Sequence, residues 1–132
     1  MKRLLRLAIC FALATTAVSC SDSTGPGASL AGTYNLRSLN GSSLPVTLCD
    51  LNGGGCYDVL SAQIFLDANG NYESVNRYSD GTETSDGYWQ LSGRDLTLVD
   101  SFDGYRSYAT VSGSDLVFDN LGGASITAVY SR

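Results

Sequence analysis

The sequence contains no histidine, and its single lysine is Lys2, near the start of the chain. These absences remove the side chains that most often serve as a base near neutral pH, as a transition-metal ligand or as an amine nucleophile. Carboxylates, hydroxyls and arginines remain, but none of the 13 acidic residues lies on a plainly apolar strand face where its pKa would rise. We therefore expect no catalytic residue, no metal site and no cofactor, and we predict that the protein is not an enzyme.

The sequence also lacks an apolar run of the roughly 20 residues that a membrane-spanning helix needs. Its N-terminal apolar run, residues 7–14, follows a basic segment and ends at Thr15 and Thr16, after which small residues dominate. A basic segment, an apolar segment and then small residues form the order of a secretory signal peptide, which is removed on export. The pattern predicts a signal peptide over residues 1–19 and no permanent transmembrane helix.

Basic residues are scarce once this leader is removed. Five of the eight basic residues remain, all of them Arg, against 13 acidic residues, so the formal net charge is −8. A compact domain of this charge repels phosphate backbones and anionic lipid surfaces. The composition therefore argues against a nucleic-acid partner.

The leader ends in Ala17-Val18-Ser19-Cys20. These residues resemble the lipobox of bacterial lipoproteins, in which small residues precede a cysteine that is acylated and becomes the new N-terminus. The resemblance implies a lipid such as palmitate on Cys20 and attachment to a membrane of the cell envelope. Ser21, rather than Asp, follows the cysteine, which in that family favours the outer membrane over the inner one. Ala17 stands where the family most often has Leu, and plain secretion is the alternative.

The cysteine count separates these two alternatives. Cys10 leaves with the leader, and Cys20, Cys49 and Cys56 remain. A lipid on Cys20 leaves an even pair for an oxidising compartment, whereas plain secretion leaves an odd thiol. We expect a disulfide between Cys49 and Cys56 to close the glycine-rich segment 50–55, because a redox role needs a closer Cys-x-x-Cys pair.

The exported chain divides into two parts. Residues 20–29 are rich in Ser, Gly and Pro and have no apolar periodicity, which predicts a flexible tether that begins with the lipidated Cys20. Residues 30–132 have a usual length for one domain and are too few for two.

This domain is predicted to be all-β. Short alternating runs, separated by Gly, Asn, Asp and Ser, indicate eight or nine strands, at 33–38, 44–48, 57–66, 71–78, 85–91, 95–101, 105–111, 115–119 and 124–130. Turns this tight join antiparallel neighbours, and a meander of this length removes its edges by closing on itself. The sequence therefore favours a small antiparallel up-and-down β-barrel over a two-sheet β-sandwich.

Several short motifs are similar to those of the small lipocalin-like domains found in bacterial lipoproteins. They lie at residues 32–36, 40–41, 44–45, 67–72, 87–91 and 129–132. Tyr34 takes the place of the Trp in the opening Gly-x-Trp of lipocalins, and the resemblance implies that Arg132 packs on this ring. It also implies a barrel that binds a small apolar or amphipathic molecule.

Two functions fit such a barrel. In the first, aromatic and apolar side chains line a ligand pocket; strand alternation and the resemblance suggest a lining of Tyr34, Leu36, Leu60, Ala62, Ile64, Tyr72, Trp89 and Leu91. In the second, the same residues fill the barrel, and the protein acts as an interaction module for an envelope protein, with residues 48–57 as the first candidate surface. The second predicts no cavity and an exposed apolar patch or free sheet edge. In both we expect a monomer.

Overall fold

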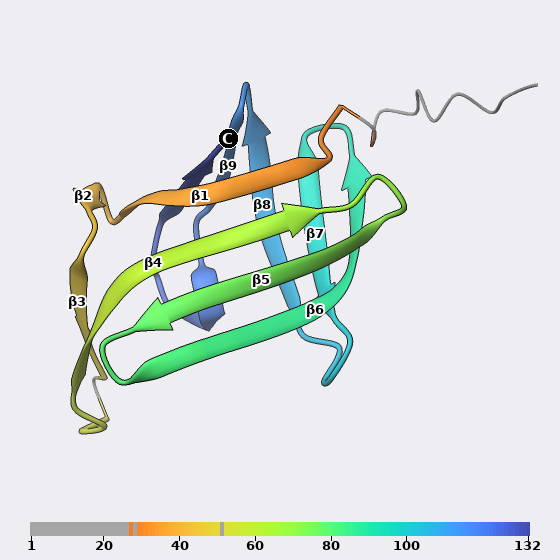
Figure 1. The fold of residues 1–132 in the computed structure, drawn as a ribbon. Coiled ribbons are helices and arrows are strands. Elements are labelled where there is room, and N and C mark those ends of the chain that lie inside the picture. The colour runs from red at the N-terminus through yellow and green to blue at the C-terminus, as the bar shows by residue number, and fades with distance from the viewer. Residues whose placement is uncertain (1–26, 28, 51) are drawn as a thin grey trace, which may run out of the picture.

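The computed structural model describes residue 27, residues 29–50 and residues 52–132 of the chain (Figure 1). This part is almost entirely β-structure. Its strands are β1 (Gly32–Leu39), β2 (Ser42–Ser43), β3 (Val46–Cys49), β4 (Cys56–Leu66), β5 (Asn71–Tyr78), β6 (Gly81–Ser92), β7 (Asp95–Asp100), β8 (Arg106–Ser112), β9 (Asp115–Phe118) and β10 (Ala128–Ser131). The 3₁₀ turn η1 (Leu121–Gly123) lies between β9 and β10. In these described ranges, no helix is long and apolar enough to cross a membrane.

Eight of these strands form a closed antiparallel barrel, which confirms the predicted fold class. The hydrogen-bonded order runs from β1 through β10, β9, β8, β7, β6 and β5 to β4, and β4 pairs with β1 to close the ring (Figure 1). Apart from the β10–β1 and β4–β1 contacts, neighbours in the ring follow one another along the chain; short turns connect most of them, and a longer segment with η1 connects β9 to β10. The β1–β4 ladder excludes the two-sheet sandwich.

The seam between β1 and β4 is paired over only part of its length. Residues 32–35 of β1 pair with residues 63–66 of β4. Farther along, the end of β1 pairs with β2, and the start of β4 pairs with β3. The barrel is therefore extended at one end by two short extra strands. Pro45, which lacks an N–H donor, lies between them outside the ladders, so the strand predicted at 44–48 begins only at Val46.

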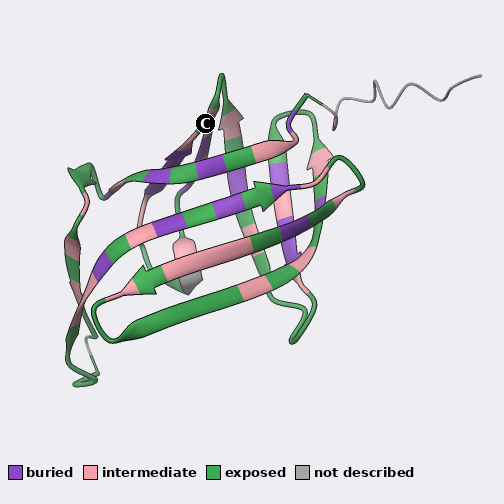
Figure 2. Ribbon diagram, in the orientation of Figure 1, coloured by how far each residue is buried: buried purple, intermediate pink, exposed green. Residues whose placement is uncertain are grey.

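The two ends of the barrel differ. We call the end formed by β3, the β7–β8 turn and η1 the mouth, and the opposite end, where β1 begins, the closed end. At the closed end the side chains of Leu30, Tyr34, Leu66 and Trp89 are at most 7% exposed (Figure 2). The described chain also begins at the closed end (Figure 1).

Tyr34 is the centre of the closed end. Its hydroxyl donates a hydrogen bond to the carbonyl oxygen of Leu30 (2.8 Å) and accepts one from Nε of Arg132 (3.0 Å). The guanidinium carbon of Arg132 lies 5.1 Å from the centre of the Tyr34 ring, within the range of a cation–π contact. The packing of Arg132 on Tyr34, which the resemblance implied, is confirmed.

The starts of two strands differ from the prediction by four residues each. β6 begins at Gly81 rather than at residue 85, because the β5–β6 turn needs only Ser79 and Asp80 between the paired residues Tyr78 and Gly81. Residues 81–84 pair with β5 although all four are exposed. The sequence there has no alternation of apolar and polar residues that could have predicted this part of the strand. β10 begins at Ala128 rather than at residue 124, because η1 and an irregular segment precede it.

Candidate functional site

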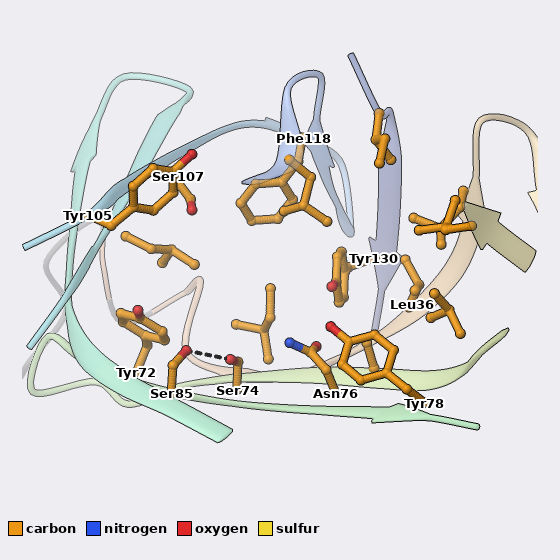
Figure 3. A pocket seen from close by; sticks show the side chains of 18 of the residues that line it. Leu36, Tyr72, Ser74, Asn76, Tyr78, Ser85, Tyr105, Ser107, Phe118 and Tyr130 are labelled. Atoms are coloured by element: carbon orange, nitrogen blue, oxygen red, sulfur yellow. Dashed lines mark hydrogen bonds between the residues drawn. The ribbon is translucent and has the colours of Figure 1, made fainter. Parts of the chain in front are cut away.

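A cavity of about 300 Å³ lies inside the barrel, between the closed end and the mouth (Figure 3). This volume is at the lower limit of pockets that hold small molecules. The residues that line it come from nearly all the strands and from η1: Leu36, Leu39, Leu48, Tyr57, Val59, Ala62, Ile64, Tyr72, Ser74, Asn76, Tyr78, Ser85, Leu98, Tyr105, Ser107, Phe118, Leu121, Ile126 and Tyr130. The filled-barrel hypothesis predicts no cavity, and the structure contains one.

The cavity reaches the mouth, where the disulfide predicted from the sequence is present. Cys49 and Cys56 are cross-strand partners on β3 and β4, and their sulfur atoms are bonded. Each cysteine is adjacent to a residue of the cavity lining, Leu48 on β3 and Tyr57 on β4. The disulfide therefore fixes one side of the mouth. On the other side Tyr105 lines the cavity and is still 46% exposed.

One wall of the cavity is polar. Residues two apart on a strand point to the same face, and β5 directs Tyr72, Ser74, Asn76 and Tyr78 into the barrel. Ser85 of β6 is the cross-strand partner of Ser74, and their hydroxyl oxygens are 2.8 Å apart. Figure 3 shows these side chains in a row along β5 and β6, all directed toward the open space.

The rest of the wall is mostly apolar. Leu36, Ile64 and Leu98 contribute branched aliphatic groups, and Phe118 packs edge-to-face with Tyr130 at a centroid distance of 5.6 Å. Ser107 and Tyr105 supply two further hydroxyls from β8 and from the residue that precedes it (Figure 3). The cavity thus offers one polar wall and a larger apolar surface to an occupant.

No Asp, Glu, Lys, Arg or His is among the residues that line the cavity. Burial raises the pKa of Tyr72, and the carboxylates of Asp100, Asp86 and Asp103 raise it further, against a hydrogen bond with Ser85 that lowers it. Burial and the nearby Glu83 raise the pKa of Tyr78 to about 12. Burial also raises the pKa of Tyr130. These three phenols are therefore neutral at physiological pH.

Four of the eight predicted lining residues lie in the cavity wall: Leu36, Ala62, Ile64 and Tyr72. Tyr34 and Trp89 are buried but do not line the cavity, because they fill the closed end. The indole Nε1 of Trp89 donates a hydrogen bond to the carbonyl oxygen of Asp67 in the β4–β5 turn (2.9 Å). Leu91 is half-buried outside the cavity lining.

The predicted position of Leu60 is wrong. Its side chain is 49% exposed, whereas Val59 is 4% exposed and lines the cavity. The pairing of β4 with β5 shifts by one residue between Val59 and Ser61, which is a β-bulge. A single extra residue reverses the alternation that precedes it, so the inward residue before the bulge is Val59.

The polar wall was missed by the sequence analysis. Its signal is the alternation along the strand at 71–78, which puts Tyr72 and Tyr78 on one face because they are an even number of residues apart. Ser74 and Asn76 lie between them on that same face and must therefore also point inward. Ser85 follows from its pairing with Ser74, which a two-residue β5–β6 turn fixes.

Residues 1–19 and Cys20, the predicted signal peptide and lipidation site, lie outside the described residues. Two residues that we assigned to the tether, Gly27 and Ser29, contact the barrel. A Cβ atom on Gly27 would lie 2.9 Å from Cη2 of Trp89, and the carbonyl oxygen of Ser29 accepts a hydrogen bond from the Arg132 guanidinium. In the described part of the chain, no three His, Cys, Asp or Glu side chains are grouped so that they could hold a metal ion.

No family model matches this sequence, and no curated protein matches it. Among solved structures, the chain is similar to a lipocalin-like protein from Bacteroides uniformis, with 16% sequence identity and a TM-score of 0.48. The similarity covers 78% of this chain and 97% of that protein.

Proposed function

We propose that this protein is an exported envelope lipoprotein whose barrel binds a small amphipathic molecule, and that it is not an enzyme. The observation that carries the proposal is the cavity of about 300 Å³ with one polar wall and a larger apolar surface. An apolar cavity of about 150 Å³ holds one benzene molecule, so this cavity has room for roughly a dozen non-hydrogen atoms.

The two ends of the barrel support a single route of entry. Tyr34, Trp89 and Leu30 fill the closed end, and the hydrogen bonds of Tyr34 to Leu30 and Arg132 hold it shut. At the mouth, the lining residue Tyr105 is exposed to solvent. A ligand therefore enters and leaves at the mouth.

The proposed lipid on Cys20 would orient this mouth. Gly27, which contacts Trp89 at the closed end, is the seventh residue after Cys20. Fully extended, seven residues span at most about 25 Å. A lipid on Cys20, at the outer membrane as proposed, would therefore keep the closed end near the bilayer, and the mouth would face the aqueous compartment.

The test is native mass spectrometry of the mature protein, purified from the envelope with minimal detergent, followed by extraction of any retained compound. We expect a defined additional mass that organic solvent removes. Ala62→Leu adds volume inside the cavity and should abolish this mass, whereas Leu60→Ala alters an exposed side chain and should leave it unchanged. A folded protein that stays at its bare mass with every candidate ligand would contradict the proposal.

The alternative, an interaction module for an envelope protein, is favoured by one surface observation. Phe102, in the β7–β8 turn, is 97% exposed, and Tyr108 on β8 is 65% exposed. Exposed aromatic side chains are common at protein interfaces. If a partner binds there, Phe102→Ser should abolish its capture by cross-linking in cells, while Ala62→Leu should not.

A further inference from the structure

We propose that the cavity selects an uncharged amphiphile whose head group both donates and accepts hydrogen bonds, such as an alcohol or a primary amide. The head group binds a cluster formed by Ser74, Asn76 and Ser85, which we call the polar cluster. This inference rests on the proposed function and names the chemical class of the ligand.

The polar cluster has hydrogen-bonding capacity that the protein does not use. The two serine hydroxyls lie 2.8 Å apart, so one of their two protons is shared between them. Ser85 lies beside Tyr72 and Asn76 beside Tyr78, close enough for each polar side chain to lower the pKa of its neighbouring phenol. A carboxamide has two donor protons and an acceptor oxygen, and each hydroxyl oxygen has two lone pairs, so several positions remain for a ligand.

These unused positions face the cavity. In the described part of the chain, no fully buried side-chain nitrogen or oxygen lacks a hydrogen-bond partner. All three side chains of the polar cluster line the cavity and are half-buried, so water in the cavity can satisfy their remaining capacity. A ligand that displaces this water keeps its affinity only if it replaces the hydrogen bonds.

Part of the apolar surface, Ala62 and Ile64, lies on the strand next to the polar cluster, and another part lies across the cavity from it. Phe118 on β9 comes from the far side of the barrel and Leu36 comes from β1, and both face the cavity (Figure 3). A ligand with its head group on the cluster would place its hydrocarbon part against these residues. The arrangement therefore fits a molecule with one polar end and one apolar end.

The surrounding charges disfavour an anionic head group. The cavity lining contains no Arg or Lys that could pair with a carboxylate. The nearest acidic groups, Asp86, Asp100 and Asp103 around Tyr72 and Glu83 beside Tyr78, add a negative potential. A buried anion without a partner loses its hydration and gains nothing in return, so it neutralises or stays in water.

An ammonium head group is also disfavoured, because no carboxylate lines the cavity to pair with it. Its desolvation in the cavity would be compensated only by the acidic residues outside the lining. The neutral phenols of Tyr72, Tyr78 and Tyr130 keep the cavity itself uncharged.

The experiment compares four molecules with the same eight-carbon chain: 1-octanol, octanamide, octanoate and octylammonium. Each is titrated at pH 7.5 into the mature protein, and binding is measured by calorimetry. We expect 1-octanol and octanamide to bind, and octanoate and octylammonium to bind at least about tenfold more weakly, a difference that one unpaired buried charge readily exceeds. Octanoate or octylammonium binding as tightly as 1-octanol would overturn the inference, while the proposed function would stand.

Two variants locate the head group. The double variant Ser74→Ala/Ser85→Ala should weaken 1-octanol binding about fivefold to tenfold, the usual effect of losing one hydrogen bond. Ser107→Ala removes a hydroxyl from the opposite side of the same cavity and should leave the affinity unchanged. Equal losses in both variants would refute the assignment to the polar cluster. Failure of all four compounds to bind the unaltered, folded protein would instead contradict the proposed function.

Discussion

Replacing Tyr34 by phenylalanine tests how the closed end is held together. Tyr34 is 1% exposed, and its hydroxyl joins the carbonyl oxygen of Leu30 at 2.8 Å to Nε of Arg132 at 3.0 Å. Tyr34→Phe keeps the aromatic ring and its contact with the Arg132 guanidinium. It leaves the carbonyl oxygen of Leu30 and Nε of Arg132 without the hydroxyl as a hydrogen-bond partner. The bond to Leu30 is buried and the bond from Arg132 is part-buried; at about 1 to 1.5 kcal/mol for the first and about 0.5 to 1 kcal/mol for the second, we expect a loss of about 1.5 to 2.5 kcal/mol in the free energy of unfolding.

The assay is urea unfolding followed by the fluorescence of Trp89, the only tryptophan, which lies at the same end. The midpoint should fall while the slope stays constant, because the surface exposed on unfolding does not change. Tyr108→Phe is the matched control, since that side chain is 65% exposed and should cost less than about 0.5 kcal/mol. A Tyr34→Phe protein as stable as the Tyr108→Phe protein would refute the assigned role of the hydroxyl.

Three further predictions concern the mouth, Tyr78 and Gly87 of β6. Replacing Cys49 and Cys56 by serine should lower the free energy of unfolding by about 2.5 kcal/mol, the chain-entropy value for a closed loop of about eight residues, as measured by urea unfolding; an unchanged midpoint would contradict this. The pKa of Tyr78 is raised from 10.0 to about 12, so the folded state favours its neutral phenol. The part of the free energy of unfolding that comes from this shift should be lost as the pH rises from about 10 through about 12. Absorbance titration of the phenolates should show a late-ionising group that Tyr78→Phe removes, and an unaltered titration curve in that variant would be inconsistent with this assignment. A Cβ on Gly87 would overlap the carbonyl oxygen of Val99 and lie 2.9 Å from the Tyr72 ring, so Gly87→Ala should destabilise the domain by about 1 to 3 kcal/mol in thermal or urea unfolding. Gly81→Ala, whose Cβ would meet nothing within 4 Å, is its control, and equal stability of the two variants would show that the close approach of Val99 and Tyr72 does not require this glycine.

The architecture was predictable because turn residues and alternation are local signals. β5 was predicted with the observed bounds, since a tight Asp-Ala-Asn-Gly turn precedes it and Tyr72 and Tyr78 mark its inner face. Closure into a barrel followed from the number of strands joined by short turns. The packing of Arg132 on Tyr34 came from the family resemblance, and no local pattern would have indicated it.

The candidate site was only half predictable, for two physical reasons. Alternation shows which face of a strand a residue occupies but not its depth along the barrel axis, so Tyr34 and Trp89 were expected in the cavity and instead fill the closed end. Alternation also fails across a bulge, which places Leu60 outside the barrel and Val59 inside. The inward Ser74 and Asn76 were passed over because polar residues are expected on the outer face.

Mapping of ligand contacts by nuclear magnetic resonance tests the central claim, binding inside the barrel, most directly. Isotope-labelled mature protein would be titrated with 1-octanol while backbone and side-chain chemical shifts are followed. We predict saturable shift changes at Ile64, Ser74 and Phe118, which line the cavity, and none at Tyr108 on the outer face. Changes confined to the outer face around Tyr108, or no saturable change at any residue, would contradict ligand binding in this cavity.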